Sequence, residues 1–96
     1  MITDYIPTGR ENAVSKQFLA SISGLTERNV RAQISNARRK GTCIIYRFEA
    51  GGYYMPDFTK ADDLAELNHF LNAERKRAQE ILLNVRRMRK GLRDEL

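Results

Sequence analysis

Glycine and proline divide the first part of the chain into short pieces and leave one long uninterrupted piece after it. These breaks recur from Gly9 to Pro56, and beyond them neither residue occurs again before Gly91. Residues 60–93 also have high helix propensity, which predicts one helix of about 30 residues, or two helices if the chain bends near Asn72. The 96-residue chain is therefore expected to combine one long helix with several short elements.

Two short helices are predicted before residue 42. The first covers residues 15–23, where Phe18, Leu19 and Ile22 fall on one apolar stripe, and it ends at Gly24. A connection of two residues then leads directly into the second helix. Such a short link places the two helices close together and at a defined angle.

The second helix is predicted to separate apolar and basic side chains cleanly. Thr26 can cap its start, and Gly41 closes it. Val30, Ile34 and Ala37 share the apolar face, which should enter the core. The opposite face carries three arginines and a serine, namely Arg28, Arg31, Ser35 and Arg39.

A β-hairpin is predicted to follow the second helix. β-Branched and aromatic residues fill two runs, 42–48 and 53–55, on either side of a turn-forming segment at 49–52. Helix, tight turn, basic helix and hairpin in this order is the plan of a winged helix-turn-helix, in which the second helix enters a major groove. The expected fold class is α+β, mostly α.

The segment KQFLASISGLTERNVRAQI resembles the helix-turn-helix of the biotin-operon-repressor-like N-terminal domain type. Ala20 stands at the family's small packing position, Gly24 at its turn, and Val30 and Ile34 where the recognition helix enters the core. GGYYMP is similar to the family's wing return. The resemblance implies a winged helix-turn-helix over residues 1–56 that binds double-stranded DNA.

Two features of the sequence depart from that family. The residues before position 15 lack the pattern of a full helix, so the N-terminal helix is expected to be reduced. The predicted wing tip has no Lys or Arg, and Arg47 is the only cation near it. We therefore expect the second helix to contribute more to binding than the wing.

The long helix over 60–93 carries apolar residues at heptad spacing, and residues 57–96 are expected to be a helical extension within the same single domain. Its stripe can pack on the core in place of the missing helix, or it can pair with a second subunit. Both can hold if Leu64, Leu67 and Phe70 cover the core and the second half forms a homodimer. The dimer contacts would then be the apolar residues of that half, namely Ala78, Ile81, Val85, Met88 and Leu92.

The net charge favours an anionic partner. Seventeen Lys and Arg against twelve Asp and Glu give a net charge of +5 and a pI near 9.7. Arg28, in the first turn of the second helix, is expected to contact a base, whereas cations near its C-terminus should meet phosphates. The complete set of expected DNA-binding residues is Thr26, Arg28, Arg31, Ser35, Arg38, Arg39, Lys40 and Arg47.

The sequence favours sequence-specific double-stranded DNA binding by a transcriptional regulator or a replication or recombination accessory, similar to small prophage-like proteins. The alternative is a winged-helix adaptor whose basic face binds an acidic protein, and RNA binding or DNA bending are further possibilities. One histidine and one cysteine leave no metal cluster or catalytic motif, so neither enzyme activity nor a cofactor is expected. A small-molecule effector domain, a membrane segment and a secretory signal are likewise not expected, which predicts a cytoplasmic protein.

Overall fold

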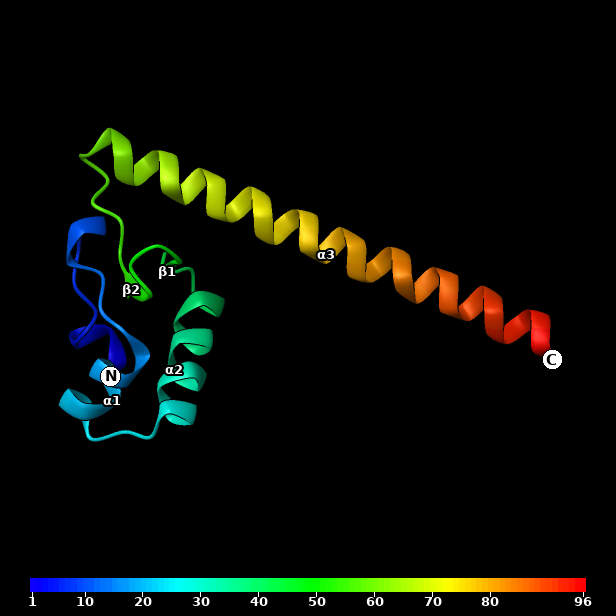
Figure 1. Cartoon of the computed structure of the whole chain (residues 1–96), viewed down its shortest axis with the longest axis horizontal. Helices are drawn as coiled ribbons and strands as arrows, with labels where there is room; N and C mark the ends of the chain where they lie inside the picture. The colour runs from blue at the N-terminus through cyan, green and yellow to red at the C-terminus, as the bar shows by residue number, and fades with distance from the viewer.

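The computed structural model describes all 96 residues and is mostly helical, with a small two-stranded antiparallel sheet (Figure 1). This confirms the expected mostly α, α+β class. The elements in chain order are two 3-10 helices, η1 (Ile2–Asp4) and η2 (Arg10–Asn12), then α1 (Lys16–Ser23), α2 (Glu27–Arg39), β1 (Ile45–Arg47), β2 (Gly52–Tyr54) and α3 (Ala61–Glu95).

The two short helices begin and end where the sequence predicts. The Ser15 hydroxyl accepts a hydrogen bond from the Phe18 N–H at 3.0 Å and caps α1. Gly24 ends that helix with φ of 75°, a left-handed conformation that favours glycine. The Thr26 hydroxyl accepts from the Asn29 N–H at 3.1 Å and caps α2. Local capping therefore fixes the short link between α1 and α2.

The hydrophobic core lies between α2, α1 and the N-terminal segment. The predicted apolar face of α2 is confirmed as buried. In α1, however, only Leu19 is fully buried, whereas Phe18 and Ile22 are more than two-fifths exposed, so the expected apolar stripe of that helix is only partly used. The buried cluster consists of Ile2, Ile6, Leu19, Val30, Ile34, Ala37 and Ile44.

The hairpin turn lies one residue earlier than predicted. Arg47 pairs with Gly52, so the turn covers residues 48–51 and Gly52 belongs to β2. On the other side of β2, Val14 and Tyr53 exchange backbone hydrogen bonds of 3.0 and 2.7 Å. A Cβ at position 52 would lie 2.8 Å from backbone atoms of Val14. Only glycine therefore lets the N-terminal segment run beside the hairpin.

The N-terminal segment, and not α3, takes the place of the missing first helix. Ile2 and Ile6 are buried in the core, and the Ile2 N–H donates to the Gln33 side-chain oxygen of α2 at 2.8 Å. The sequence predicts that Leu64, Leu67 and Phe70 of α3 cover this core, but none of the three belongs to the buried cluster or packs against it. That expectation is wrong because residues 1–6 already fill the space.

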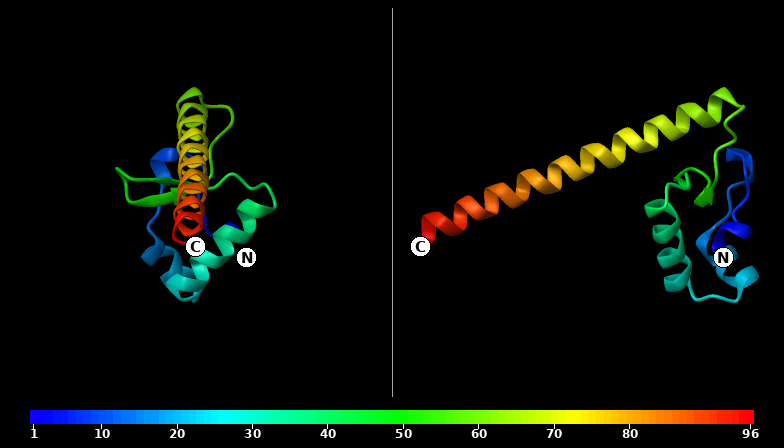
Figure 2. Two further views of the ribbon diagram at one scale, coloured as in Figure 1. Left: turned by 90° about the vertical axis from the view of Figure 1, so that its right-hand side faces the viewer. Right: turned by 180° about the vertical axis from the view of Figure 1, so that it is seen from behind.

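Helix α3 is a single helix without a break near Asn72. It starts above the hairpin and extends far beyond the body formed by residues 1–60, so that the C-terminus lies well away from the rest of the chain (Figures 1 and 2). From Arg75 onward every side chain except Val85 is exposed. None of the helices has the length and apolar content needed to cross a bilayer.

Polar groups in the first turns of α3 attach it to the body. Glu66 lies at the centre, accepting hydrogen bonds from the Arg10 guanidinium at 2.6 Å and from the Tyr54 hydroxyl at 2.8 Å. Asp63, which is fully buried, accepts from the Asp57 N–H at 2.8 Å. Because these groups are charged or hydrogen-bonded and partly buried, the orientation of α3 at its start is fixed by directional contacts.

We expect Ile2→Ala to lower the free energy of unfolding by about 2–5 kcal/mol, because it leaves a cavity in a packed core. Ile22→Ala is the matched control, and its partly exposed side chain should cost less than about 1 kcal/mol. Urea denaturation followed by circular dichroism measures both variants. Equal losses would show that the N-terminal segment does not complete the core.

Stability should fall at alkaline pH because of Tyr54. Burial, and then the hydrogen bond to Glu66, raise the pKa of the Tyr54 hydroxyl above its usual value near 10. The folded state therefore holds this proton more tightly than the unfolded state. The resulting stabilisation is complete below the unfolded pKa and is lost as pH rises above about 10.

Urea denaturation from about pH 8 to about pH 11 tests this expectation. The free energy of unfolding of the wild type should drop more steeply above about pH 10 than that of Tyr54→Phe. Tyr5→Phe, which changes an exposed tyrosine, should follow the wild type. Parallel curves for the wild type and Tyr54→Phe would contradict the assignment.

Candidate nucleic-acid interface

The exposed face of α2 carries most of the predicted DNA-binding side chains. Arg28, Arg31 and Ser35 all point away from the core. Glu27 is the only acidic residue of the helix and lies in its first turn. Arg28 and Arg31 form no ion pair within the chain. Their guanidinium groups are therefore available to a ligand, and α2 itself lies at the edge of the body (Figure 1).

The C-terminal end of α2 is also basic, but its cations differ in the contacts that they form within the chain. Lys40, which follows the helix, is exposed and forms no ion pair. Arg39 is exposed and donates to the Asn36 side-chain oxygen at 3.2 Å, a contact on the helix surface that is easily exchanged for another. Both side chains can reach a phosphate without disturbing the core.

Arg38 has contacts that the sequence did not indicate. Its Nε donates to the Ile44 carbonyl oxygen at 2.9 Å, and its guanidinium carbon lies 5.2 Å from the centre of the Phe70 ring. This geometry is that of a cation–π contact. Burial lowers the pKa of the Arg38 guanidinium, which nevertheless stays charged at neutral pH. Arg38 thus links the end of α2 to the segment just before β1 and to α3, and only part of its charge faces outward.

Arg47, the only cation near the predicted wing tip, is directed toward the body. Its Nη1 donates to the Arg10 carbonyl oxygen at 3.2 Å, and its other nitrogens lie 3.8 Å from carboxylate oxygens of Glu49 and Glu66. The tip itself presents Phe48, whose side chain is 87% exposed. The hairpin therefore offers aromatic and hydroxyl groups to a ligand more readily than charge.

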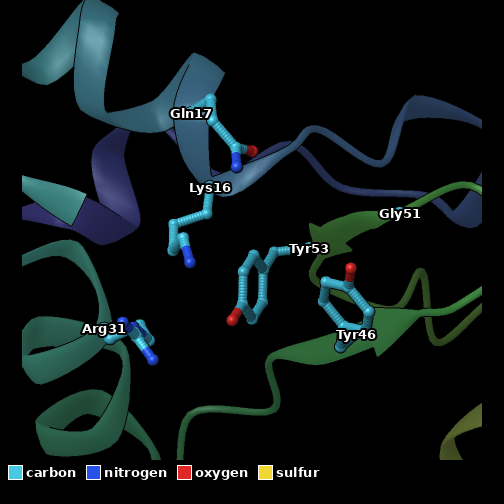
Figure 3. A pocket seen from close by; sticks show the side chains of 6 residues that line it. All are labelled: Lys16, Gln17, Arg31, Tyr46, Gly51 and Tyr53. Carbon is cyan, nitrogen blue, oxygen red and sulfur yellow. The ribbon is translucent and has the colours of Figure 1, made fainter. Parts of the chain in front are cut away.

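A hollow lies between α1, α2 and the hairpin. Figure 3 shows the Lys16 amine, the Arg31 guanidinium and the Tyr53 hydroxyl facing a common space, with Tyr46 beside them. The rings of Tyr46 and Tyr53 meet edge to face with centres 4.9 Å apart. The side chains that line the hollow are those of Lys16, Gln17, Arg31, Tyr46 and Tyr53, together with Gly51.

Sequence reasoning identified only Arg31 among these side chains. The available signal was the pairing of the hairpin, because residues 46 and 53 face each other across the two strands and point to one side of the sheet. With the turn assigned one residue too late, this pairing was not visible.

The second half of α3 exposes the residues that were predicted to form a dimer contact. Ile81, Met88 and Leu92 are 57%, 68% and 61% exposed, and Ala78 is exposed as well, whereas Val85 is half-buried. Leu82 and Leu83 add to the same stretch and widen it beyond the two positions per heptad of a simple paired helix. This apolar surface has no partner within the chain.

No group of three or more His, Cys, Asp or Glu side chains is arranged so that it could hold a metal ion. No protein-family model matches the sequence, and no curated protein or solved structure is significantly similar to it. The function must therefore be inferred from the surfaces of the molecule itself.

Proposed function

We propose that this protein binds double-stranded DNA sequence-specifically, with α2 in the major groove. The observation that carries the proposal is the division of α2 into a buried apolar face and an exposed basic face. Val30, Ile34 and Ala37 hold the helix in the core, while the other side presents guanidinium groups without acidic partners. A duplex has a regular array of negative charge along its grooves, which suits such a surface.

The shape of α2 also supports this function. Its 13 residues correspond to about 20 Å of helix. The major groove of B-DNA is about 12 Å wide and accepts one α-helix. Arg28 lies in the first turn, where a side chain can reach the base edges, and Arg39 and Lys40 lie at the other end, near a phosphate backbone. Base contact and backbone contact are thus assigned to opposite ends of the same helix.

The order of the elements supports a winged helix-turn-helix. In this assignment α1 and α2 form the helix-turn-helix, β1 and β2 form the wing, and Val14 adds an isolated antiparallel bridge to Tyr53. The turn η1, with Ile2 and Ile6, stands in for the first helix of that fold. A small protein of this kind would act as a transcriptional regulator or as a replication or recombination accessory.

We expect the protein to bind duplex DNA with an affinity that falls steeply with salt, with a slope of about 0.9 per phosphate contacted. Arg28→Ala should cost about 1–3 kcal/mol on the preferred sequence and reduce the preference over random DNA. Arg39→Ala should weaken binding to both DNAs alike. Fluorescence anisotropy with a duplex selected from random sequences measures each affinity.

Two results would contradict the proposal in different ways. Absence of duplex binding at low salt would remove DNA as the ligand and leave an acidic protein as the partner of the basic face. Equal losses on selected and random DNA for Arg28→Ala would keep DNA binding but remove Arg28 as the base-contacting residue. Circular dichroism shows whether each variant is folded.

We further propose that two copies pair through the second half of α3. A helix that projects into water without contacts is only marginally stable, and the apolar residues from Ala78 to Leu92 would gain stability by leaving water. Two copies would also supply two recognition helices, and one recognition helix contacts only a few base pairs. The exposure of Ile81 and Met88 is the observation that supports pairing.

We expect Ile81→Asp combined with Val85→Asp to convert a dimer into a folded monomer with weaker binding to a two-site operator, because paired charges would be buried in the contact. Asn72→Asp combined with Gln79→Asp is the control, since it adds the same charge to exposed heptad positions outside the stripe. Sedimentation equilibrium at tens of micromolar compares the three proteins. A monomeric wild type would contradict pairing.

A further inference from the structure

The hollow between α1, α2 and the hairpin is lined by hydrogen-bond donors that form few contacts with other groups of the chain. Neither Tyr46 nor Tyr53 uses its hydroxyl in a hydrogen bond with the protein, and the Arg31 guanidinium and Gln17 amide are equally free. The Lys16 amine has one loose ion pair, 3.9 Å from a carboxylate oxygen of Glu27. None of the six lining residues is acidic.

These groups come from three different elements and face one space. Lys16 and Gln17 begin α1, Arg31 lies in the middle of α2, and the two tyrosines project from β1 and β2 (Figure 3). Two positive charges together with hydroxyl and amide donors form a set that suits a tetrahedral oxyanion. The edge-to-face contact of the tyrosine rings holds them in place without using their hydroxyls.

The position of the hollow favours a phosphate group within a nucleic acid chain. Arg31 belongs both to the hollow and to the exposed face of α2. A helix seated in a major groove has a sugar-phosphate backbone on each side of it. The hollow lies on the side of α2 that faces the hairpin, where one of these backbones would pass.

We propose that this hollow binds one backbone phosphate of the duplex, with Lys16 and Arg31 supplying charge and Tyr53 supplying a neutral donor. The inference rests on the proposed DNA binding and specifies how the hairpin takes part in it. The wing would then contact the DNA backbone through tyrosine hydroxyls. Arg47 would not take part, because it is directed toward Glu66.

Affinity measurements with two variants test the hollow. Lys16→Gln should weaken duplex binding about three- to tenfold at about 0.1 M salt and lower the salt slope by about 0.9. Tyr53→Phe removes one hydroxyl and keeps the ring that packs on the core, so it should weaken binding about two- to fivefold with an unchanged slope.

Matched controls lie elsewhere on the surface. Lys60→Gln removes the same charge beside Glu11, and Tyr5→Phe removes a hydroxyl from an exposed tyrosine outside the hollow. Both should bind duplex within about twofold of the wild type. Thermal unfolding of all four variants shows whether each remains folded.

Duplexes with a single methylphosphonate identify the phosphate itself. Removing the charge of one particular phosphate in a half-site should weaken duplex binding by the wild type. The same methylphosphonate should cause no further loss of affinity in Lys16→Gln. Additive losses at every position would overturn the inference. If the wild type binds duplex and both hollow variants bind like their controls, the inference fails and the proposed function stands.

A titration with inorganic phosphate at constant ionic strength separates a nucleic acid phosphate from a free one. We expect no saturable change in the amide chemical shifts of Lys16 and Tyr53 at micromolar phosphate. Saturation there, with duplex affinity unchanged in Lys16→Gln, would make the hollow a site for free phosphate and overturn the inference. If the wild type binds no duplex, the proposed function falls and this inference falls with it.

Discussion

Burial of one face of α2 is the interaction on which the rest of the molecule depends. Val30, Ile34 and Ala37 can leave water only if the opposite face of the helix stays in it, because a 13-residue helix in a body this small has no room for two buried faces. The core that receives them is completed by Ile2 and Ile6, from a segment whose only regular element is the short 3-10 helix η1. Stability and the exposure of the arginines therefore have one cause. A substitution that loosens the core should also disturb the basic surface, so binding studies on this protein need a measurement of folding beside them.

Helix α3 is attached to the body in a different way, by directional polar contacts. Glu66 joins Arg10 of the N-terminal segment, Arg47 of β1 and Tyr54 of β2, and so ties three separate parts of the body to one helix. Partly buried contacts of this kind fix the angle between α3 and the body more sharply than apolar packing does. Their net contribution to stability is smaller than their number implies, because burying charged groups also costs free energy. They also explain why Arg47 is not free at the hairpin tip. The cation that the sequence assigned to the wing is used to orient α3.

The elements that local signals determine could be predicted from the sequence, and those that depend on distant residues could not. Capping by Ser15 and Thr26 and the apolar spacing of α2 involve residues within a few positions of one another, and both predictions are confirmed. The turn was placed one residue too late because Gly52 of β2 pairs with Arg47, and the absence of a Cβ there matters only for the close approach of Val14, almost forty positions earlier. The roles of Ile2 and Arg38 were missed for the same reason. The free donors around Tyr53 became visible only with the correct strand pairing.

The continuity of α3 places a geometric condition on the proposed dimer. The helix is continuous from Ala61 to Glu95, so the contact to the body at Glu66 and the apolar stretch around Ile81 are about 22 Å apart along one axis. Pairing that is antiparallel about Val85 would place the two attachment points about 57 Å apart, at opposite ends of the paired helices. Parallel pairing brings both bodies to the same end. We therefore expect parallel pairing if two α2 helices bind neighbouring half-sites of one duplex, because only that arrangement brings both bodies to the same end of the paired helices.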